Sequence, residues 1–490
     1  MMQLFGSRNG CLPWMFVCLV VVTAVTVLAD GGRDDSSRVS SENVGWNWWD
    51  GLRLDLFEQY STAWMRSVAP PDGGADWPKL EMNARVVAAV ILGSLGACIC
   101  AAGGVGGGGL FIPIFNLLLL FDAKTSAALS NIMILAGSIA VLAWNIRRTH
   151  PLSPGKPLID YDVALLLNPN MLLGISIGVF CNITFPGWLL ISVLTVILFY
   201  MTNRSIQNGF TRWKKESAAA AKAKEKIAIV SAHSVETGQR TSGLTEPLLG
   251  GQSEPSLFAQ CPPQKLIKLV MMWLLFFAVQ ILRGGEGTEG ILKVKPCGLA
   301  YWLLSASQLP LAIGLTAWIA LQHSSKSHAA KPSESNEEVD VMLTSRAYTV
   351  FPLMALLAGM LGGMLGIGGG MIINPMLTEV GMHPQATAGT SSFMIFFATS
   401  MSVLQFWLLG RIPMDFALLF GAVCLFWSCV GIGLLQAAIV KHGRPSVIVF
   451  LVSSVMGVSA LLMATFGGFN VWHQYRAGDY MGFHAACGEK

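Results

Sequence analysis

The chain has 490 residues and a formal net charge of +4, with 53% hydrophobic and only 12% charged residues. Its mean hydropathy is +0.57, which excludes an ordinary soluble globular protein, and the small net charge gives no support for a nucleic-acid partner. Residues 86–121 and 163–203 contain no charged side chain, and a helical span needs about 20 apolar residues. Because backbone groups must bond internally in hydrocarbon and alternating strand patterns are absent, we predict an all-α integral membrane protein, a polytopic helical bundle.

The N-terminus is typical of a secretory signal. Arg8 precedes an apolar run from Cys11 to Leu28, and a polar stretch follows. The run is slightly long, so residues 1–29 are either a cleaved signal peptide or an uncleaved signal anchor. Residues 30–84 would then be a luminal or extracellular segment, and the protein would enter the secretory pathway toward the plasma membrane or an endomembrane.

Two glycine-rich breaks interrupt the apolar stretches. The first runs from Gly104 to Pro113 and the second from Gly366 to Pro375, at a constant offset of 262 residues. Each is followed by a segment of small polar residues, 124–131 and 385–392, that opens a new apolar run. A duplicated, interrupted hydrophobic element in both halves of a membrane protein points to a substrate site.

The chain divides into two transmembrane repeats with connecting segments. We predict a first repeat at 85–204, a flexible cytoplasmic loop at 205–263 with a short helix at 216–229, connecting helices at 264–322, a cytoplasmic loop at 323–346, a second repeat at 347–467 and a tail at 468–490. The expected helices are 86–103, 125–146, 163–182, 187–204, 264–282, 299–322, 347–366, 386–409, 414–440 and 446–467, with short pieces at 109–121 and 371–380.

Loop charges predict the orientation of the repeats. Arg147, Arg148 and the Lys-rich 205–263 loop are expected to be cytoplasmic under the positive-inside rule. Counting passes from them, the first broken pair starts and ends on the outer side, and the second starts and ends on the cytoplasmic side. The sequence therefore predicts two inverted-topology repeats, each containing a helix hairpin broken by glycines, as in many secondary transporters.

The breaks have a chemical consequence. Glycine runs followed by proline are poor helix formers, so they free backbone groups that need protein, water or a ligand as a partner. The helix starts that follow carry hydroxyl groups and free N–H groups, which suit anions. Two such starts facing each other would cradle a small anion, although close packing and ordinary N-capping explain the same residues. The candidate substrate-binding residues are Gly106, Gly107, Gly108, Gly109, Pro113, Lys124, Thr125, Ser126, Ser130, Asn131, Gly368, Gly369, Gly370, Asn374, Pro375, Thr387, Thr390, Ser391 and Ser392.

Other residues allow fewer conclusions. Glu379 or His383 could carry a coupling proton, or could simply mark the interfacial end of a short helix. The first break lacks the Gly-Lys-Ser/Thr ending of a nucleotide-binding loop. The ten cysteines show no disulfide or metal-ligand spacing, and we expect no metal and no cofactor. Isolated glycines at 174, 178, 431 and 433 are expected to allow close helix packing.

Several motifs resemble one known family, the sulfite exporter TauE/SafE family, also called toluene sulfonate uptake permeases. They are Gly104-Val-Gly-Gly-Gly-Gly-Leu-Phe-Ile-Pro113, Phe121-Asp-Ala-Lys-Thr-Ser126 and Gly366-Ile-Gly-Gly-Gly370. Ile159-Asp-Tyr-Asp-Val-Ala-Leu-Leu, Leu173-Gly-Ile-Ser-Ile-Gly-Val and Trp213-Lys-Lys-Glu-Ser217 are similar to its larger plant-type branch. The resemblance covers about residues 80–470 and implies a multi-pass transporter of small sulfur-containing anions, such as sulfite or organosulfonates.

Three functional classes follow from this interpretation. The leading hypothesis is a secondary transporter of small anions that works by alternating access within the lipid bilayer, as a monomer or a homo-oligomer. The alternative is a non-transporting scaffold or assembly factor that binds partners through the 205–263 loop. We do not expect an enzyme, because no nucleophile motif or cluster of histidine and acidic residues lies within the apolar spans.

Overall fold

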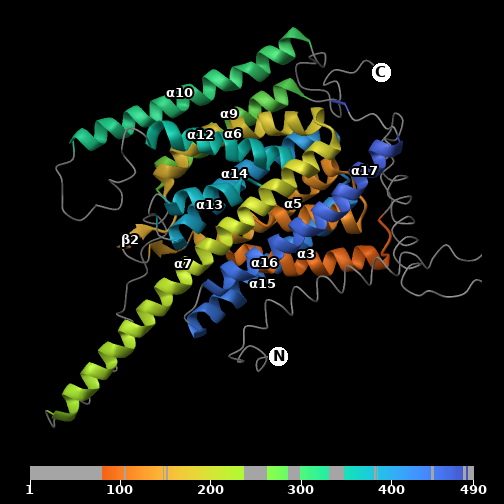
Figure 1. The fold of residues 1–490 in the computed structure, drawn as a ribbon. Coiled ribbons are helices and arrows are strands. Elements are labelled where there is room, and N and C mark those ends of the chain that lie inside the picture. The colour runs from red at the N-terminus through yellow and green to blue at the C-terminus, as the bar shows by residue number, and fades with distance from the viewer. Residues whose placement is uncertain are drawn as a thin grey trace, which may run out of the picture.

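The structure is a computed structural model in which residues 80–103, 106–146, 148–150, 153–236, 262–284, 298–329, 347–379, 382, 384–442, 446–477 and 482–483 are described. Helices account for nearly all of these residues (Figure 1). The elements are α3 (Ala84–Gly103), α4 (Gly108–Pro113), the π-helix η2 (Ile114–Leu118), α5 (Ala123–Asn145), α6 (Tyr161–Thr184), α7 (Gly187–Glu236), α9 (Pro263–Arg283), α10 (Leu299–Ala329), α12 (Ala347–Leu365), α13 (Gly370–Glu379), α14 (Pro384–Leu408), α15 (Met414–His442), α16 (Ser446–Leu462), the π-helix η4 (Met463–Gly467) and α17 (Gly468–Ala477).

The described part of the chain confirms a polytopic helical membrane protein. It contains nine helices long and apolar enough to cross a bilayer, together with shorter apolar helices at Gly108–Leu118 and Val350–Leu365. The only described sheet is a hairpin of β1 (Thr149–His150) and β2 (Ser153–Pro157), which the sequence did not predict. The expected signal at 1–29 lies outside the described residues, as does most of the segment at 30–84.

The expected helices match the observed ones closely in the two repeats, but the helix expected at 187–204 is longer than predicted. Helix α7 continues without interruption through the first half of the segment expected to be a flexible loop and projects from the bundle (Figure 1). The physical reason is composition: residues 213–229 are rich in Ala, Lys and Glu, which favour helix, and contain no Gly or Pro. Residues 237–261 lie outside the described part of the chain.

Glu216 ties the projecting part of α7 to the start of α16. Its two carboxylate oxygens accept hydrogen bonds from the backbone N–H of Ser446 at 3.0 Å and from the Ser446 hydroxyl at 2.5 Å. The carboxylate therefore bonds an otherwise unpaired donor at a helix N-terminus, where negative charge is stabilising. This contact explains a structural role for Glu216 within the Trp213–Ser217 motif.

Removing this carboxylate should loosen the start of α16. We expect Glu216→Ala to destabilise the first turn of α16 by about 1 kcal/mol, the usual cost of losing a helix cap. Hydrogen exchange of the Ser446 amide and of the first intrahelical amides, at 450–452, should become several-fold faster, while Lys214→Ala, two positions away and exposed, should leave it unchanged. Equal protection in wild type and Glu216→Ala would contradict the capping role.

The two repeats pack against each other in a reciprocal pattern. Helix α3, the first of one repeat, packs along α15, and α12, the first of the other repeat, packs along α6. Helices α5 and α14, which follow the two breaks, pack against each other. Exchanging the two sets of helices leaves this pattern of packing unchanged.

Glycines bring α6 and α12 into backbone contact. A Cβ atom at Gly174 would overlap the carbonyl oxygen of Leu356, one at Gly178 that of Met360, and one at Gly359 that of Met171. The expectation of close packing is therefore confirmed for Gly174 and Gly178. It also holds for Gly431 of α15, against α3, but it is wrong for Gly433, where nothing lies within 4 Å.

Helices α9 and α10 lie at the edge of the bundle, and α10 runs along its outside (Figure 1). Large apolar side chains on α10 are exposed, including Leu299 at 78% and Leu321 at 69%. Such surface suits hydrocarbon rather than water, because backbone groups are bonded within the helix and only apolar side chains face outward.

Candidate functional site

The two glycine breaks meet at the centre of the bundle. A Cβ atom at Gly108 would overlap the Cα atom of Ile367 and would lie 2.7 Å from the carbonyl oxygen of Gly366. The backbone turns through left-handed conformations in both breaks, with φ of 88° at Gly106 and 73° at Gly366, and with similar positive values at Gly107, Gly368 and Gly369. Glycine is required here twice, for the backbone conformation and for the close approach.

Each break also lies against the helix that follows the other break. Gly366 packs on Ala127 of α5, and its carbonyl oxygen accepts a hydrogen bond of 2.7 Å from the hydroxyl of Ser130. Ser392 of α14, which is offset from Ser130 by 262 residues, lines a small cavity beside Gly106 of the first break. The contacts are therefore crosswise, and they connect the two repeats at their centre.

Side chains of the first repeat bond carbonyl groups freed by the second break. In addition to Ser130, Asn182 donates from its Nδ2 atom to the carbonyl oxygen of Met364 at 2.6 Å. Asn182 is buried. Protein groups thus satisfy two of the acceptors expected at membrane depth.

Loss of the Ser130 hydroxyl should destabilise the junction of the breaks. Ser130→Ala would leave the buried carbonyl of Gly366 without its partner, at an expected cost of about 1–3 kcal/mol. Thermal unfolding of the purified protein in detergent should show a lower midpoint than wild type. Ser192→Ala is the control, because the exposed Ser192 hydroxyl bonds only to a carbonyl of its own helix and should change the midpoint little.

The hydroxyl-rich starts of α5 and α14 do not face each other, so that geometric expectation is wrong. At the start of α5, Lys124 donates from Nζ to the carbonyl oxygen of Ile183, at the C-terminal end of α6. At the start of α14, the Thr390 hydroxyl accepts a hydrogen bond from the backbone N–H of Asp160, at the N-terminal end of α6. Helix α6 has 24 residues, so these starts lie about 35 Å apart along it.

Most hydroxyl groups of these helix starts bond to their own chain segment. Asp122 caps α5 by accepting from the Thr125 N–H at 3.3 Å. The remaining hydroxyls donate to carbonyls within five residues: Ser126 to Phe121, Thr387 to Met382, Ser391 to Ala388 and Ser392 to Ala388. These residues are buried, and their contacts are those of capping and local packing.

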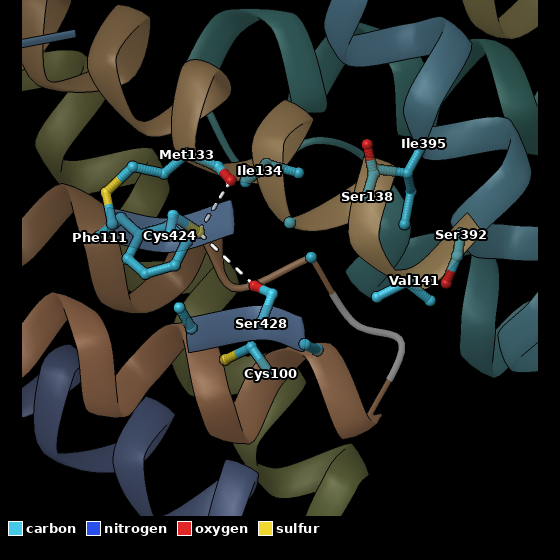
Figure 2. A pocket seen from close by; sticks show the side chains of 14 residues that line it. Cys100, Phe111, Met133, Ile134, Ser138, Val141, Ser392, Ile395, Cys424 and Ser428 are labelled. Atoms are coloured by element: carbon cyan, nitrogen blue, oxygen red, sulfur yellow. Dashed lines mark hydrogen bonds between the residues drawn. The ribbon is translucent and has the colours of Figure 1, made fainter. Parts of the chain in front are cut away.

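A cavity of about 20 Å³ lies beside the first break, between α3, α5, α14 and α15, and holds about one water molecule. Figure 2 shows hydroxyl and thiol groups around it, from Ser138 and Ser392 on one side to Cys100, Cys424 and Ser428 on the other. Cys424 donates from Sγ to the Met133 carbonyl at 3.0 Å. A space for one water molecule is smaller than an oxyanion of several heavy atoms needs.

Asn131 is a candidate residue whose polar side-chain atoms, Oδ1 and Nδ2, have no hydrogen-bond partner. Its side chain is fully buried. It follows Ala127 by four residues and precedes Ile134 by three, so it shares their side of α5. Both of these residues contact break glycines, which places Asn131 at the edge of the junction.

Sequence reasoning missed a polar network on the other side of the bundle. The Nε2 atoms of Gln280 on α9 and Gln405 on α14 both donate to the hydroxyl of Ser176 on α6, at 2.9 and 3.0 Å. All three side chains are buried. A signal was available, because Gln280 and Gln405 are isolated amides within apolar helices, where polar residues mark interhelical contacts or function.

The ionisable candidates lie at helix ends. The Lys124 ammonium interacts electrostatically with Arg411 and Asp122. Glu379 is the last residue of α13, and His383 lies outside the described residues. Sequence analysis also overlooked Asp160, the N-cap of α6, whose carboxylate accepts from the N–H groups of Asp162 and Val163. Burial raises the pKa of the Asp160 carboxyl above its ordinary value.

The remaining predicted residues lie on the short helices. Pro113 is the last residue of α4, and Asn374 and Pro375 lie inside α13. Neither proline interrupts its short helix. Gly109 packs on Met371 and Leu198. Met371 stands 262 residues after Gly109, so the two repeats carry a glycine and a methionine at equivalent positions. Gly370 begins α13, and the N–H groups of Gly370 and Met371 have no acceptor within their own helix.

A multi-pass helical bundle with two broken elements in contact at its centre has the architecture of a membrane transporter. The chain belongs to the sulfite exporter TauE/SafE family, whose model matches residues 5–204 and 351–481. The chain is 41% identical to sulfite exporter TauE/SafE family protein 2 of Arabidopsis thaliana over 84% of this chain and 89% of that protein. It is 40% identical to family protein 5 of the same plant, over 96% of this chain and 99% of that protein. No solved structure matches the chain.

Proposed function

We propose that this protein is a secondary transporter of small sulfur oxyanions, such as sulfite or an organosulfonate, working by alternating access. The observation that carries the proposal is the direct contact of Gly108 with Gly366 and Ile367, which joins the two breaks at one point. Membership of a transporter family favours this function over a scaffold or an enzyme.

The two repeats are proposed to have inverted topology. Reciprocal packing of α3 on α15 and of α12 on α6 supports a two-fold relationship, and the loop charges favour opposite entry faces for the two repeats. In such an arrangement, rocking one set of helices against the other opens the centre to one face and closes it to the other. The water-sized cavity then corresponds to a closed stage of this cycle.

The substrate would bind where the short helices begin. The N–H groups of Gly370 and Met371 lie at the start of α13, which is the positive end of that helix dipole. Gly108 and Gly109 occupy the equivalent positions at the start of α4, which continues into η2. These amides, with the neighbouring carboxamide of Asn131, provide neutral donors for an anion when the helices separate.

Two cationic groups would guide the anion from one face. Lys124 and Arg411 interact electrostatically, and both lie at the end of the bundle where α6 terminates. Like charges close together repel, so an anion between them would relieve that repulsion. For coupling, Glu379 and His383 remain the proposed proton carriers, and Asp160 joins them as a carboxyl with a raised pKa.

Uptake of radiolabelled sulfite into proteoliposomes that contain the full chain is the direct test. We expect saturable, protein-dependent flux that Gly369→Leu abolishes, because φ at Gly369 is +70° and a Cβ there would lie 2.9 Å from the Ala358 carbonyl. Equal flux for wild type and Gly369→Leu, or flux no greater than in protein-free vesicles for every sulfur oxyanion tried, would overturn the proposal.

The cellular setting is also proposed. The protein is an integral multi-pass membrane protein, and we propose that it reaches the plasma membrane or an endomembrane by the secretory pathway, directed by residues 1–29. We further propose that the bilayer and the small anion are its partners, and that homo-oligomers form through its exposed apolar faces.

A further inference from the structure

The centre of the bundle contains a carboxamide that the folded chain leaves without partners. Asn131 is fully buried, and neither side-chain atom that can form hydrogen bonds does so. An unpaired buried amide costs free energy, because the bonds it made to water in the unfolded chain are not replaced. Because Asn131 lies beside Ala127 and Ile134, which touch the break glycines, its amide is placed to meet whatever enters the junction.

The surroundings of the junction carry no charge. The side chains that the break glycines approach, among the described residues, are all neutral, including Ile134, Ile367, Met371 and Thr399. The Lys124 ammonium is held by the Ile183 carbonyl at the far end of α6. The cost of removing an ion from water rises with the square of its charge, so neutral donors accommodate a single negative charge far better than two.

The hydrogen-bonding groups of the junction include acceptors as well as donors. A carboxamide has two N–H donors and an oxygen that accepts. The Ser130 hydroxyl donates its proton to the Gly366 carbonyl, so only its lone pairs remain for a ligand. A fully ionised oxyanion has no hydrogen to give and would be repelled by these oxygens, whereas a protonated oxyanion satisfies both kinds of group.

We propose that the site selects a singly charged, protonated sulfur oxyanion, namely hydrogen sulfite, over the sulfite and sulfate dianions. The Asn131 Nδ2 donates a hydrogen bond to a negatively charged oxygen of the ligand. Oδ1 of Asn131 or Oγ of Ser130 accepts a hydrogen bond from the ligand's O–H, and the ligand keeps its proton. The inference rests on the proposed transport function and adds the protonation state of the substrate to it. Sulfite takes up a proton near neutral pH, so the transported species would be a pH-dependent fraction of total sulfite.

Equilibrium binding to the full-length protein in detergent tests this without any proton gradient. Radiolabelled sulfite is titrated at several pH values across the range in which it is protonated, with sulfate and methanesulfonate as competitors. We expect the apparent Kd for total sulfite to rise with pH while the Kd expressed as hydrogen sulfite stays constant. Sulfate should compete poorly, and methanesulfonate, a monoanion without a proton, should compete at an intermediate level.

Variants assign the selection to Asn131. Asn131→Leu should weaken sulfite binding at least about tenfold and narrow the difference between sulfite and methanesulfonate. Gln308→Leu is the matched control, because Gln308 is also a buried amide without partners but lies on α10, which packs on α6 and α9. Asn131→Ser, which retains a shorter donor and acceptor, serves if the leucine variant does not fold.

The outcomes separate the inference from the proposed function. Binding that depends on total sulfite at every pH, or sulfate that competes as well as sulfite, would overturn the selection of hydrogen sulfite while leaving anion transport intact. Equal weakening by Asn131→Leu and Gln308→Leu would remove Asn131 from the selection. No binding and no flux of any sulfur oxyanion would instead overturn the proposed function itself.

Discussion

Gly366→Ala is expected to reduce sulfite flux at least about tenfold and to lower the stability of the folded protein. The substitution places a Cβ 2.6 Å from both the Cα atom and the carbonyl oxygen of Ala127, and forces alanine into φ of +73°. Backbone strain and overpacking each cost about 1–3 kcal/mol. Since about 1.4 kcal/mol is tenfold in an equilibrium constant, the closed conformation would lose more than tenfold in population.

Comparison with Gly106→Ala separates the steric effect from backbone strain. Gly106 also has positive φ, at 88°, but its Cβ would meet only side chains, the nearest being Cγ2 of Ile134 at 3.4 Å. We therefore expect a smaller loss of thermal stability and of flux in Gly106→Ala. Both are measured on the same reconstituted preparations. Equal effects of the two substitutions would mean that the close approach of Gly366 to Ala127 does not add to the loss of stability and flux caused by backbone strain.

Gly178→Ala is expected to have the second largest effect, on folding rather than on the site. Its Cβ would overlap the carbonyl oxygen of Met360 and lie 2.8 Å from the Met364 N–H nitrogen, so α6 and α12 would have to separate. Backbone cannot move aside as a flexible side chain can, and an expected cost of about 3 kcal/mol follows from overpacking. The yield of monodisperse protein in size-exclusion chromatography should fall several-fold.

Gly433→Ala is the matched control for that experiment. Gly433 also lies in a membrane-spanning helix, α15, but nothing would lie within 4 Å of a Cβ there. Alanine is the better helix former by about 1 kcal/mol, so this variant should be as stable as wild type or more stable. A loss of yield in Gly433→Ala similar to that in Gly178→Ala would show that α15 packs on something beyond this chain.

The helices were predictable because an apolar run of about 20 residues in a low-charge chain can bond its backbone groups within a membrane as a helix and in few other ways. The two breaks were predictable for a local reason, since Gly106–Gly109 and Gly368–Gly370 disfavour helix wherever they occur. The structure brings the two breaks into contact, with Gly108 against Ile367, while their role as a substrate site stays a prediction. The inverted orientation stays a prediction, because it depends on which face of the membrane each loop occupies.

Other features depended on tertiary contacts that no sequence window contains. The hydroxyl residues at 125–126 and 387–391 look alike in sequence, yet they lie near opposite ends of α6, where Lys124 bonds Ile183 and Thr390 bonds Asp160. Ser130, farther along α5, bonds the opposite break, whereas Ser392, farther along α14, only lines the cavity beside Gly106. The Ser176, Gln280 and Gln405 network joins helices of both repeats to the connecting segment, so its partners are separated by more than 100 residues.

The length of α7 has a mechanical consequence. This helix has 50 residues and is about 75 Å long, and Glu216 accepts a hydrogen bond from Ser446 at the start of α16. The 20 residues after Glu216 extend roughly 30 Å farther, so a rotation of about 10° in the membrane half would sweep the tip through roughly 5 Å. A fluorophore near residue 236 would therefore report small tilts of the membrane half of α7, including those expected in the proposed transport cycle.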